Sequence, residues 1–334
     1  MSDLYTPPFH LTSSMISLIA EISQTLGRLS ALEEITTNVR LRRINRIRTI
    51  QGSLAIEGNT LTQEQITAIL EGKKVIAPPR EIQEVRNAIK AYENLENWRP
   101  YSEDNLLHSH SLLMNGLLEH PGKFRTGSVG VMSGETVVHM APPANRVQHL
   151  MRDLLHWVKT TDQHPLITGS VFHYEFEFIH PFTDGNGRMG RLWQTLILSQ
   201  WNPLFTYVPV ESIVYAHQKE YYEALAKSTE NAESSVFIEF MLNRIHDAIA
   251  SFTPEVTPEV TPEVKKMLLV LKGKMTRKEI QEKLGLKDEK HFRQTYQQPA
   301  IASGLIEMTL PDKPNSRLQK YTLTTKGIEF VKSL

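Results

Sequence analysis

The 334-residue chain contains no cysteine. This absence excludes a disulfide-stapled domain, a thiolate nucleophile, and zinc or iron–sulfur sites with cysteine ligands. No run approaches 18 consecutive apolar residues, so the sequence predicts no membrane span. Residues 1–15 lack a basic region followed by an apolar run, and we therefore expect no signal peptide and a cytoplasmic protein. With 40% hydrophobic and 22% charged residues, the composition is that of a globular protein and excludes a disordered one.

The chain as a whole also lacks an excess charge, since 37 Lys and Arg balance 37 Asp and Glu. Residues 264–334 nevertheless hold 15 Lys and Arg against 7 Asp and Glu, a local charge of +8, which leaves −8 for the rest. The change coincides with residues 253–264, which read TPEV three times. Proline at every fourth position excludes a helix and favours an extended spacer. We therefore predict a first domain up to residue 252, a linker at 253–264 and a basic second domain at 265–334.

Apolar residues recur at three- and four-residue spacing through the first domain, which predicts a mainly α fold. The expected helices cover residues 13–26, 31–57, 63–70, 80–98, 103–118, 144–160, 165–178, 188–200, 210–228 and 234–250. The β-rich stretch 129–139 reads instead as a small hairpin around Ser133-Gly134. In the second domain we expect helices at 264–271, 277–285 and 288–302, the last kinked or split by Pro299, and then strands at 305–310 and 318–324. That order is typical of a winged helix-turn-helix domain.

The residues with the clearest chemistry lie at 180–191, which read HPFTDGNGRMGR. Gly185-Asn186-Gly187 directly precedes a predicted helix, so backbone N–H groups and the helix dipole favour an anion there. Arg188 and Arg191 lie three residues apart on one face of that helix, where both can reach a polyphosphate. Asp184 is a hard carboxylate beside this site and suggests Mg²⁺ shared with a nucleotide. His180 is the nearby side chain suited to general-base chemistry near neutral pH.

This run resembles the signature of the Fic family, HxFx(D/E)GNGRxxR, with every specified position filled, and the similarity extends over roughly residues 10–250. The resemblance implies an all-α Fic core, at residues 61–252, that transfers AMP from ATP to a hydroxyl of a protein side chain, with Mg²⁺, or Mn²⁺ in its place, as cofactor. It implies His180 as the base and Asp184 as the metal ligand. The nucleotide-binding residues that it implies are Gly185, Asn186, Gly187, Arg188, Met189, Gly190 and Arg191.

An upstream segment, SLAIEGN at 53–59, is similar to the family's inhibitory motif, (S/T)xxxE(G/N). It identifies Ser53, Glu57 and Gly58 as inhibitory residues within an N-terminal helical part at 1–60. Gly58 is typical of the residue that follows a helix, which places Glu57 in a last helical turn at the negative end of the dipole. Glu57 gains there from a cation, and the resemblance implies that this cation is Arg191. An exposed glutamate at a helix end is the structural alternative.

Two further sets of positions rest on the resemblance. The predicted hairpin matches the flap that holds the target, and its docking residues are Val129, Gly130, Val131 and Met132. Tyr221 and Tyr222 match an aromatic pair near the nucleoside, although both residues also suit a helix core. Thr229 stands seven residues after Tyr222, where relatives often have asparagine, which puts a nucleoside contact there in doubt.

The sequence leaves alternatives to an autoinhibited protein adenylyltransferase. The same site, with Glu57 positioning water, is compatible with removal of AMP from a modified protein. A DNA-binding regulator whose Fic domain senses nucleotide is the non-enzymatic alternative. Duplex DNA is a candidate partner of residues 265–334, with Lys313, Arg317 and Lys320 around the predicted wing. Self-modification and a homodimer are further candidates.

Overall fold

The computed structural model describes residues 5–30, 39–133, 136–251, 261–286, 288–310, 316 and 318–332. The chain forms two compact units, Met1–Thr253 and Pro254–Leu334, and each is described by itself. Residues 31–38 of the predicted second helix lie outside the described residues. Most of the predicted linker, at 253–260, lies outside them too, as do Lys313 and Arg317 of the predicted wing.

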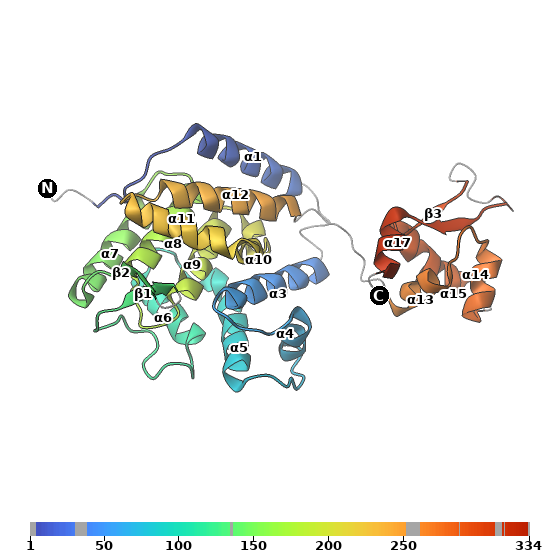
Figure 1. Ribbon diagram of the computed structural model, residues 1–334, viewed down its shortest axis with the longest axis horizontal. Helices are drawn as coiled ribbons and strands as arrows, with labels where there is room; N and C mark the ends of the chain where they lie inside the picture. The colour runs from blue at the N-terminus through green and yellow to red at the C-terminus, as the bar shows by residue number, and fades with distance from the viewer. Residues whose placement is uncertain are drawn as a thin grey trace. The chain divides into compact units, whose positions relative to one another are not determined.

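The first unit is mainly helical with one small hairpin, as the sequence predicts (Figure 1). Its helices are α1 (Ser13–Ser30), α3 (Val39–Ile56), α4 (Gln63–Leu70), α5 (Pro79–Glu93), α6 (Glu103–Leu113), α7 (Ala144–Thr160), α8 (Pro165–Ile179), α9 (Asn186–Trp201), α10 (Val210–Ala216), α11 (Gln218–Glu230) and α12 (Ser235–Ser251), with 3₁₀ turns at Leu95–Asn97 and Pro203–Thr206. The strands β1 (Gly130–Ser133) and β2 (Thr136–Met140) pair antiparallel, with an irregularity between Val131 and Met132.

Three predicted helices differ most from those in the structure. The helix expected at 80–98 ends at Glu93, before a 3₁₀ turn, and the one expected at 103–118 ends at Leu113. The helix expected at 210–228 is broken at His217 into α10 and α11. There the Gln218 side chain donates a hydrogen bond to the Ile56 carbonyl at 2.9 Å, a contact with α3 that apolar periodicity cannot show.

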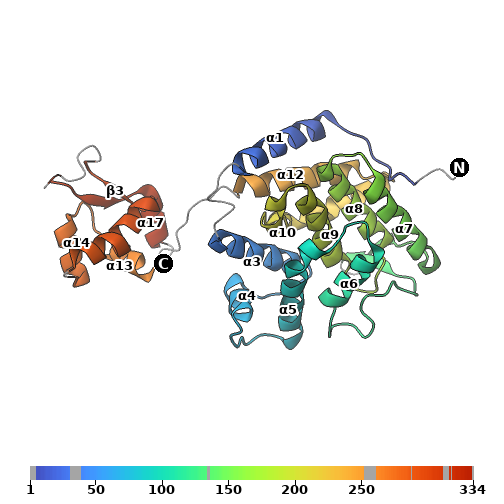
Figure 2. The ribbon, with the colours of Figure 1, turned by 180° about the vertical axis from the view of Figure 1, so that it is seen from behind.

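Helices α8 and α9 form the centre of the first unit (Figures 1 and 2). Helix α8 is apolar on nearly all sides, and such a helix is stable only when it is surrounded. Its residues from Leu166 to Phe176 are buried. Helix α12 lies between α8 and α1, and α3 packs against α10. The turn between α8 and α9 and the start of α9 carry the 180–191 motif, and α9 contacts α3.

The second unit has the predicted order of three helical segments and a β-pair, followed by a helix that the sequence analysis missed. Its elements are α13 (Pro262–Val270), α14 (Arg277–Leu284), α15 (Glu289–Phe292), a π-helical segment (Arg293–Gln297), α16 (Gln298–Ala302), β3 (Ile306–Met308), β4 (Tyr321–Leu323) and α17 (Thr325–Lys332). The two strands are shorter than predicted, and α13 begins at Pro262, within the predicted linker, because proline is tolerated at the first position of a helix. The π-helical segment ends two residues before Pro299, whose missing N–H removes a helical hydrogen bond.

Among the helices that the structure describes, none combines the length and the apolar character needed to cross a membrane.

Candidate active site

The turn between α8 and α9 is held in shape by its own side chains. His180 ends α8 in a left-handed conformation, with φ 50° and ψ 59°. Two residues later, Phe182 is fully buried and anchors the turn in the core. The Asn186 amide spans the turn, because its Oδ1 accepts a hydrogen bond from the Phe182 N–H and its Nδ2 donates to the Phe182 carbonyl, both at 2.9 Å. Since the Asn186 side chain is used inside the turn, only its backbone remains to meet a ligand.

Helix α9 begins at this turn with groups suited to an anion. Gly185 precedes the helix at φ +86°, a conformation that side chains disfavour. The first intrahelical hydrogen bond runs from the Met189 N–H to the Gly185 carbonyl at 3.0 Å. The N–H groups before Met189 have no partner within the helix, and the dipole adds positive charge at this end. The start of α9 therefore favours a phosphate or a carboxylate.

A carboxylate of the chain itself stands at this helix start. Arg191 is 3% exposed and donates from Nη2 to Oε1 of Glu57 at 2.7 Å. Its Nε also donates to Ser53 Oγ at 3.2 Å, and Nη2 donates to the Ser53 carbonyl at 3.0 Å. A Cβ built at Gly187 would collide with the same Glu57 oxygen and lie 3.0 Å from Nη1 of Arg191. Glu57 therefore lies against the glycine turn of the predicted anion site.

Burial alone would lower the pKa of Arg191, but the charge of Glu57 raises it above its ordinary value, so the guanidinium stays charged. Glu57 reaches Arg191 because α3 ends one residue earlier, at Ile56, and Gly58 turns the chain at φ +87°. The sequence places Glu57 in the last turn of this helix, whereas in the structure the helix ends one residue before it, and the glutamate lies beside the motif.

Asp184 lies at the mouth of the site, with its side chain 41% exposed. Its Oδ1 accepts a hydrogen bond from the Gly185 N–H at 2.6 Å and lies 3.2 Å from Nη2 of Arg188. Its Oδ2 lies 3.4 Å from Nη2 of Arg80 on α5. In the described part of the chain, no three His, Asp or Glu side chains gather as a metal site. The residues fit a metal held by one carboxylate and the oxygens of a ligand, and not a cage made by the protein alone.

His110 on α6 holds the backbone of Asp184, and the sequence does not predict this contact. Its Nδ1 accepts a hydrogen bond from the Gly122 N–H at 2.8 Å, which leaves the Nε2 proton to be donated to the Asp184 carbonyl at 3.0 Å. The ring stacks on Phe182 at 3.7 Å between centroids. Burial lowers the pKa of His110 to about 4, so the imidazole is neutral at ordinary pH. No spacing relates His110 to the motif in sequence, so only the fold reveals this contact.

Arg125 holds the turn at His180, and it too was missed. This arginine is 4% exposed and donates from Nε to the His180 carbonyl at 2.8 Å and from Nη2 to the Ile179 carbonyl at 3.3 Å. It also donates to the carbonyls of Gly127 and Pro142, at 2.8 and 2.5 Å, on the two sides of the hairpin. One guanidinium therefore caps α8 and ties the hairpin to the predicted base.

The remaining predicted residues are divided between the core and the site. Met189 is fully buried, and Tyr221 is 2% exposed with its hydroxyl 3.1 Å from Nε2 of His173. Tyr222 is 46% exposed, and its ring lies 5.2 Å from that of Tyr221 between centroids. Burial raises the pKa of Tyr222, and the charge of Glu57 raises it further. Gly190 packs against α8, because a Cβ there would lie 2.9 Å from the buried Oε1 of Glu177.

Val129 directly precedes β1, and Gly130, Val131 and Met132 lie on it, so the predicted docking residues are on one strand of the hairpin. The Val129 carbonyl accepts a hydrogen bond from the Ala141 N–H at 3.3 Å, which extends the pairing beyond the strand end.

Two family models match the chain. The model described as Fic/DOC family matches residues 100–198, and the model described as Filamentation induced by cAMP protein Fic-like, C-terminal domain, matches residues 262–324.

The chain is also similar to a solved structure, a Fic family protein from Desulfovibrio desulfuricans G20. The two are 49% identical, and the match covers 97% of this chain and 99% of that one, with a TM-score of 0.72. This likeness confirms the expected mainly helical fold class.

Curated relatives match over shorter spans. A protein named Protein adenylyltransferase Fic, from Nematostella vectensis, is 29% identical over 208 residues, which are 58% of this chain and 45% of that protein. A protein named Protein adenylyltransferase fic-1, from Caenorhabditis briggsae, is 33% identical over 186 residues, 52% of this chain and 34% of that protein. The chain thus spans less than half the length of these curated relatives.

Proposed function

The chain belongs to the Fic family, and we propose that it is a protein adenylyltransferase, which transfers AMP from ATP to a hydroxyl side chain of another protein. The observation that carries this proposal is the Glu57 carboxylate beside Gly187 and Arg191 at the start of α9. An acidic side chain standing there supports the interpretation that the site is built for anions. The names of the curated relatives support the reaction.

In the proposed reaction, the hydroxyl oxygen of the target attacks the α-phosphorus of ATP. A bond forms between that oxygen and phosphorus, the bond to the β-phosphate oxygen breaks, and pyrophosphate leaves. His180 takes the hydroxyl proton, and its fixed position at the end of α8 suits this role. Backbone N–H groups at the start of α9, with Arg188 and Arg191, neutralise charge on the phosphates. Positioning and charge neutralisation supply most of the catalysis in such transfers.

We propose that Asp184 holds Mg²⁺ together with the phosphates of ATP. When bound, the metal neutralises charge on the phosphates and the leaving pyrophosphate. The exposed carboxylate is now shared by Arg80, Arg188 and the Gly185 N–H, and a cation would compete with the two arginines for it.

We propose that Glu57 inhibits this reaction within the same chain. Its carboxylate engages Arg191, which would otherwise bind an outer phosphate, and lies against the glycine turn. Productive binding of ATP therefore requires Glu57 to move, and Ser53 then remains as a neutral partner of Arg191.

The hairpin and Tyr222 complete the proposed site. An extended target segment is expected to add to β1 as a further strand, which gives main-chain affinity with little dependence on target side chains. Tyr222, half exposed, is expected to contact the nucleoside, whereas Tyr221 supports it from the core through a T-shaped ring contact at 5.2 Å between centroids.

The test is transfer of label from α-labelled ATP with Mg²⁺ to a candidate target or to the chain itself. The Glu57→Gly chain should transfer label readily, and Glu57→Gly with His180→Ala should transfer it about 10²- to 10⁴-fold more slowly. Equal transfer by the two variants would contradict the role of His180. Release of AMP from a labelled target, faster with Glu57 than with glycine, would instead favour the AMP-removal alternative, for which the one-third exposed Glu57 carboxylate stands in the same site.

We further propose that the second unit binds duplex DNA weakly. Its charge is +8 over residues 264–334, and of the three predicted wing residues the structure describes Lys320, which is exposed and directly precedes β4. Binding of the full chain to duplex DNA should weaken steeply as salt rises, because phosphate contacts release counterions. No mobility shift even at low salt would overturn this proposal.

A further inference from the structure

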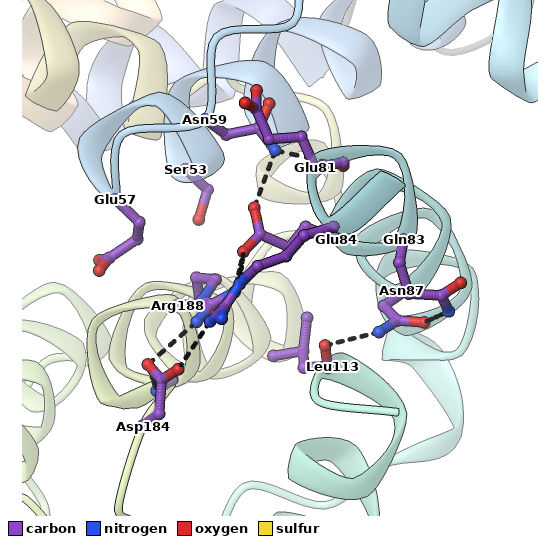
Figure 3. Close-up of polar contacts among 12 residues, drawn as sticks. Ser53, Glu57, Asn59, Glu81, Gln83, Glu84, Asn87, Leu113, Asp184 and Arg188 are labelled. Atoms are coloured by element: carbon purple, nitrogen blue, oxygen red, sulfur yellow. Dashed lines mark hydrogen bonds and ion pairs between the residues drawn. The ribbon is translucent and has the colours of Figure 1, made fainter. Parts of the chain in front are cut away.

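Arg188, the first arginine of the 180–191 motif, lies between two carboxylates (Figure 3). Its Nη2 is 3.2 Å from Oδ1 of Asp184, and its Nη1 is 3.5 Å from Oε1 of Glu84 on α5. The two carboxylates approach the guanidinium from opposite sides. The Arg188 side chain is 5% exposed and that of Glu84 12%, so solvent screens this pair far less than a surface ion pair.

Glu84 is itself held by the segment that carries Glu57. Its Oε2 accepts a hydrogen bond from Nδ2 of Asn59 at 2.8 Å, two residues after Glu57 (Figure 3). Asn59 is 7% exposed; its Nδ2 also donates to the Glu81 carbonyl at 3.2 Å, and its Oδ1 accepts from the Leu61 N–H. The end of the inhibitory segment and the Glu84 carboxylate are therefore joined by a buried amide.

Helix α5 holds Glu84 on a fixed support. One turn after Glu84, the fully buried Asn87 donates from Nδ2 to the carbonyls of Leu113 and Asn115, at 3.0 and 2.8 Å. Gln83 donates to Oδ1 of Asn87 at 2.9 Å. These contacts tie α5 to the end of α6, the helix whose His110 donates a hydrogen bond to the Asp184 carbonyl.

The guanidinium of Arg188 still has a donor to offer. Its Nε is buried, and among the described residues it has no hydrogen-bond partner. A buried donor without an acceptor is costly, and in a binding site it marks the place of an incoming acceptor. The two Nη groups thus fix the guanidinium, while Nε remains for a ligand at the start of α9.

We propose that Glu84 is a positioning residue for phosphate binding. It holds Arg188 from the side opposite Asp184, so that the guanidinium keeps its orientation when the Asp184 carboxylate is taken up by the metal. Through Asn59 it makes the position of Arg188 depend on the segment that carries Glu57. The inhibitory segment is thereby linked to both motif arginines. Glu57 contacts Arg191 directly, and Asn59 is connected to Arg188 through Glu84. This proposal rests on the proposed function, in that the ligand is Mg²⁺-ATP.

The test measures Mg²⁺-ATP affinity by calorimetry on the full chain carrying Glu57→Gly. Adding Glu84→Gln, which keeps the shape but removes the charge, should weaken binding about tenfold, since hydrogen bonds to charged groups are the stronger ones. The matched control is Glu81→Gln, one turn earlier on α5, whose carboxylate accepts hydrogen bonds from Thr60. Its affinity should stay within about twofold, because the loss of an exposed contact has little effect. Equal affinities of the two variants would overturn the proposal.

Two further comparisons separate positioning from loss of structure. In an Arg188→Ala background, Glu84→Gln should have no further effect on ATP affinity, because residues that act as one unit are not additive. The same loss with and without Arg188 would show that Glu84 acts elsewhere. Glu84→Asp keeps the charge and should bind ATP more tightly than Glu84→Gln, and equal binding by these two would exclude a role for the charge.

The outcomes also distinguish this proposal from the proposed function. If the Glu57→Gly chain binds Mg²⁺-ATP but transfers no AMP, the proposed function fails while the affinity comparison still decides the role of Glu84. If it binds no Mg²⁺-ATP at all, both fail.

Discussion

Nη2 of Arg191 lies 2.7 Å from Oε1 of Glu57, although the two residues are 134 positions apart in the sequence. The arginine is buried and the glutamate is one-third exposed, so solvent can reach the pair at the glutamate carboxylate. Because Glu57 follows the end of α3 rather than lying within it, the carboxylate can leave without unfolding the helix. This arrangement suits a reversible lock.

Replacing Glu57 with glycine is expected to raise the rate of AMP transfer at least about tenfold, because a misplacement of about 1 Å in the phosphates costs on the order of 10²-fold. Arg191→Ala should not reproduce this gain, since it removes both the partner of Glu57 and a side chain that we propose binds phosphate. The measurement is the transfer rate at saturating Mg²⁺-ATP for both single variants and the double variant. The double variant should behave like Arg191→Ala. A Glu57→Gly chain no faster than the native one would show that Glu57 is not the inhibitor.

Asp184→Ala is expected to abolish the Mg²⁺ dependence of ATP binding, because we propose this exposed carboxylate as the protein's ligand for the metal. Calorimetric titrations with Mg²⁺ and with a chelator provide the comparison. The Glu57→Gly chain should bind ATP more tightly with Mg²⁺, and the added Asp184→Ala should remove the difference. A variant that still responds to Mg²⁺ would place the metal elsewhere.

Arg125→Ala is expected to lower kcat by about 10²-fold with a smaller change in KM for ATP, because His180 would lose the group that holds its carbonyl. Arg125→Lys is the matched control for charge, since a single ammonium cannot reach the four carbonyls that the guanidinium bonds. Both variants are measured in the Glu57→Gly background below their thermal midpoints. An unchanged kcat in Arg125→Ala would contradict the positioning role.

Glu177 is expected to make the protein less stable as pH rises through the neutral range. Burial raises its pKa to about 8, opposed by the nearby charge of Arg191. Between the ordinary pKa of 4.5 and about 8, the unfolded chain has lost this proton and the folded chain keeps it, so the free energy of unfolding falls as pH rises. Glu177→Gln should therefore stabilise the fold by about 1–3 kcal/mol near pH 8 and by little near pH 4.

Thermal or urea unfolding of the native chain and of Glu177→Gln at several pH values tests this expectation. The matched control is Glu223→Gln on α11, a side chain that is 51% exposed and pairs loosely with Lys219. A gain in Glu177→Gln that did not grow with pH would show that the carboxyl is not protonated in the folded state.

Much of the first unit follows from local patterns. Apolar spacing predicts its helices, and α4 begins in the structure at a capping box formed by Thr62 and Gln65, two residues three apart in the sequence. Apolar spacing does not predict helix ends that depend on contacts with other helices. The break between α10 and α11 is an example, because Gln218 there contacts Ile56 on α3. The sequence does not predict α17, because Thr324 falls in the predicted strand 318–324, whereas in the structure its Oγ1 accepts a hydrogen bond from the Gly327 N–H at 3.1 Å at the start of the helix.

The sequence by itself determined the part of the site that lies on one continuous segment. Residues 180–191 bring a histidine, a carboxylate, glycines and two arginines to one helix start. Local hydrogen bonds, such as those between Phe182 and Asn186, contribute to the shape of that segment. Only the tertiary structure decided what surrounds it. Arg125 and His180 are 55 positions apart, and His110 and Asp184 are 74 apart. Such pairs form because helices pack side by side, and no spacing along a chain records which helices will be neighbours.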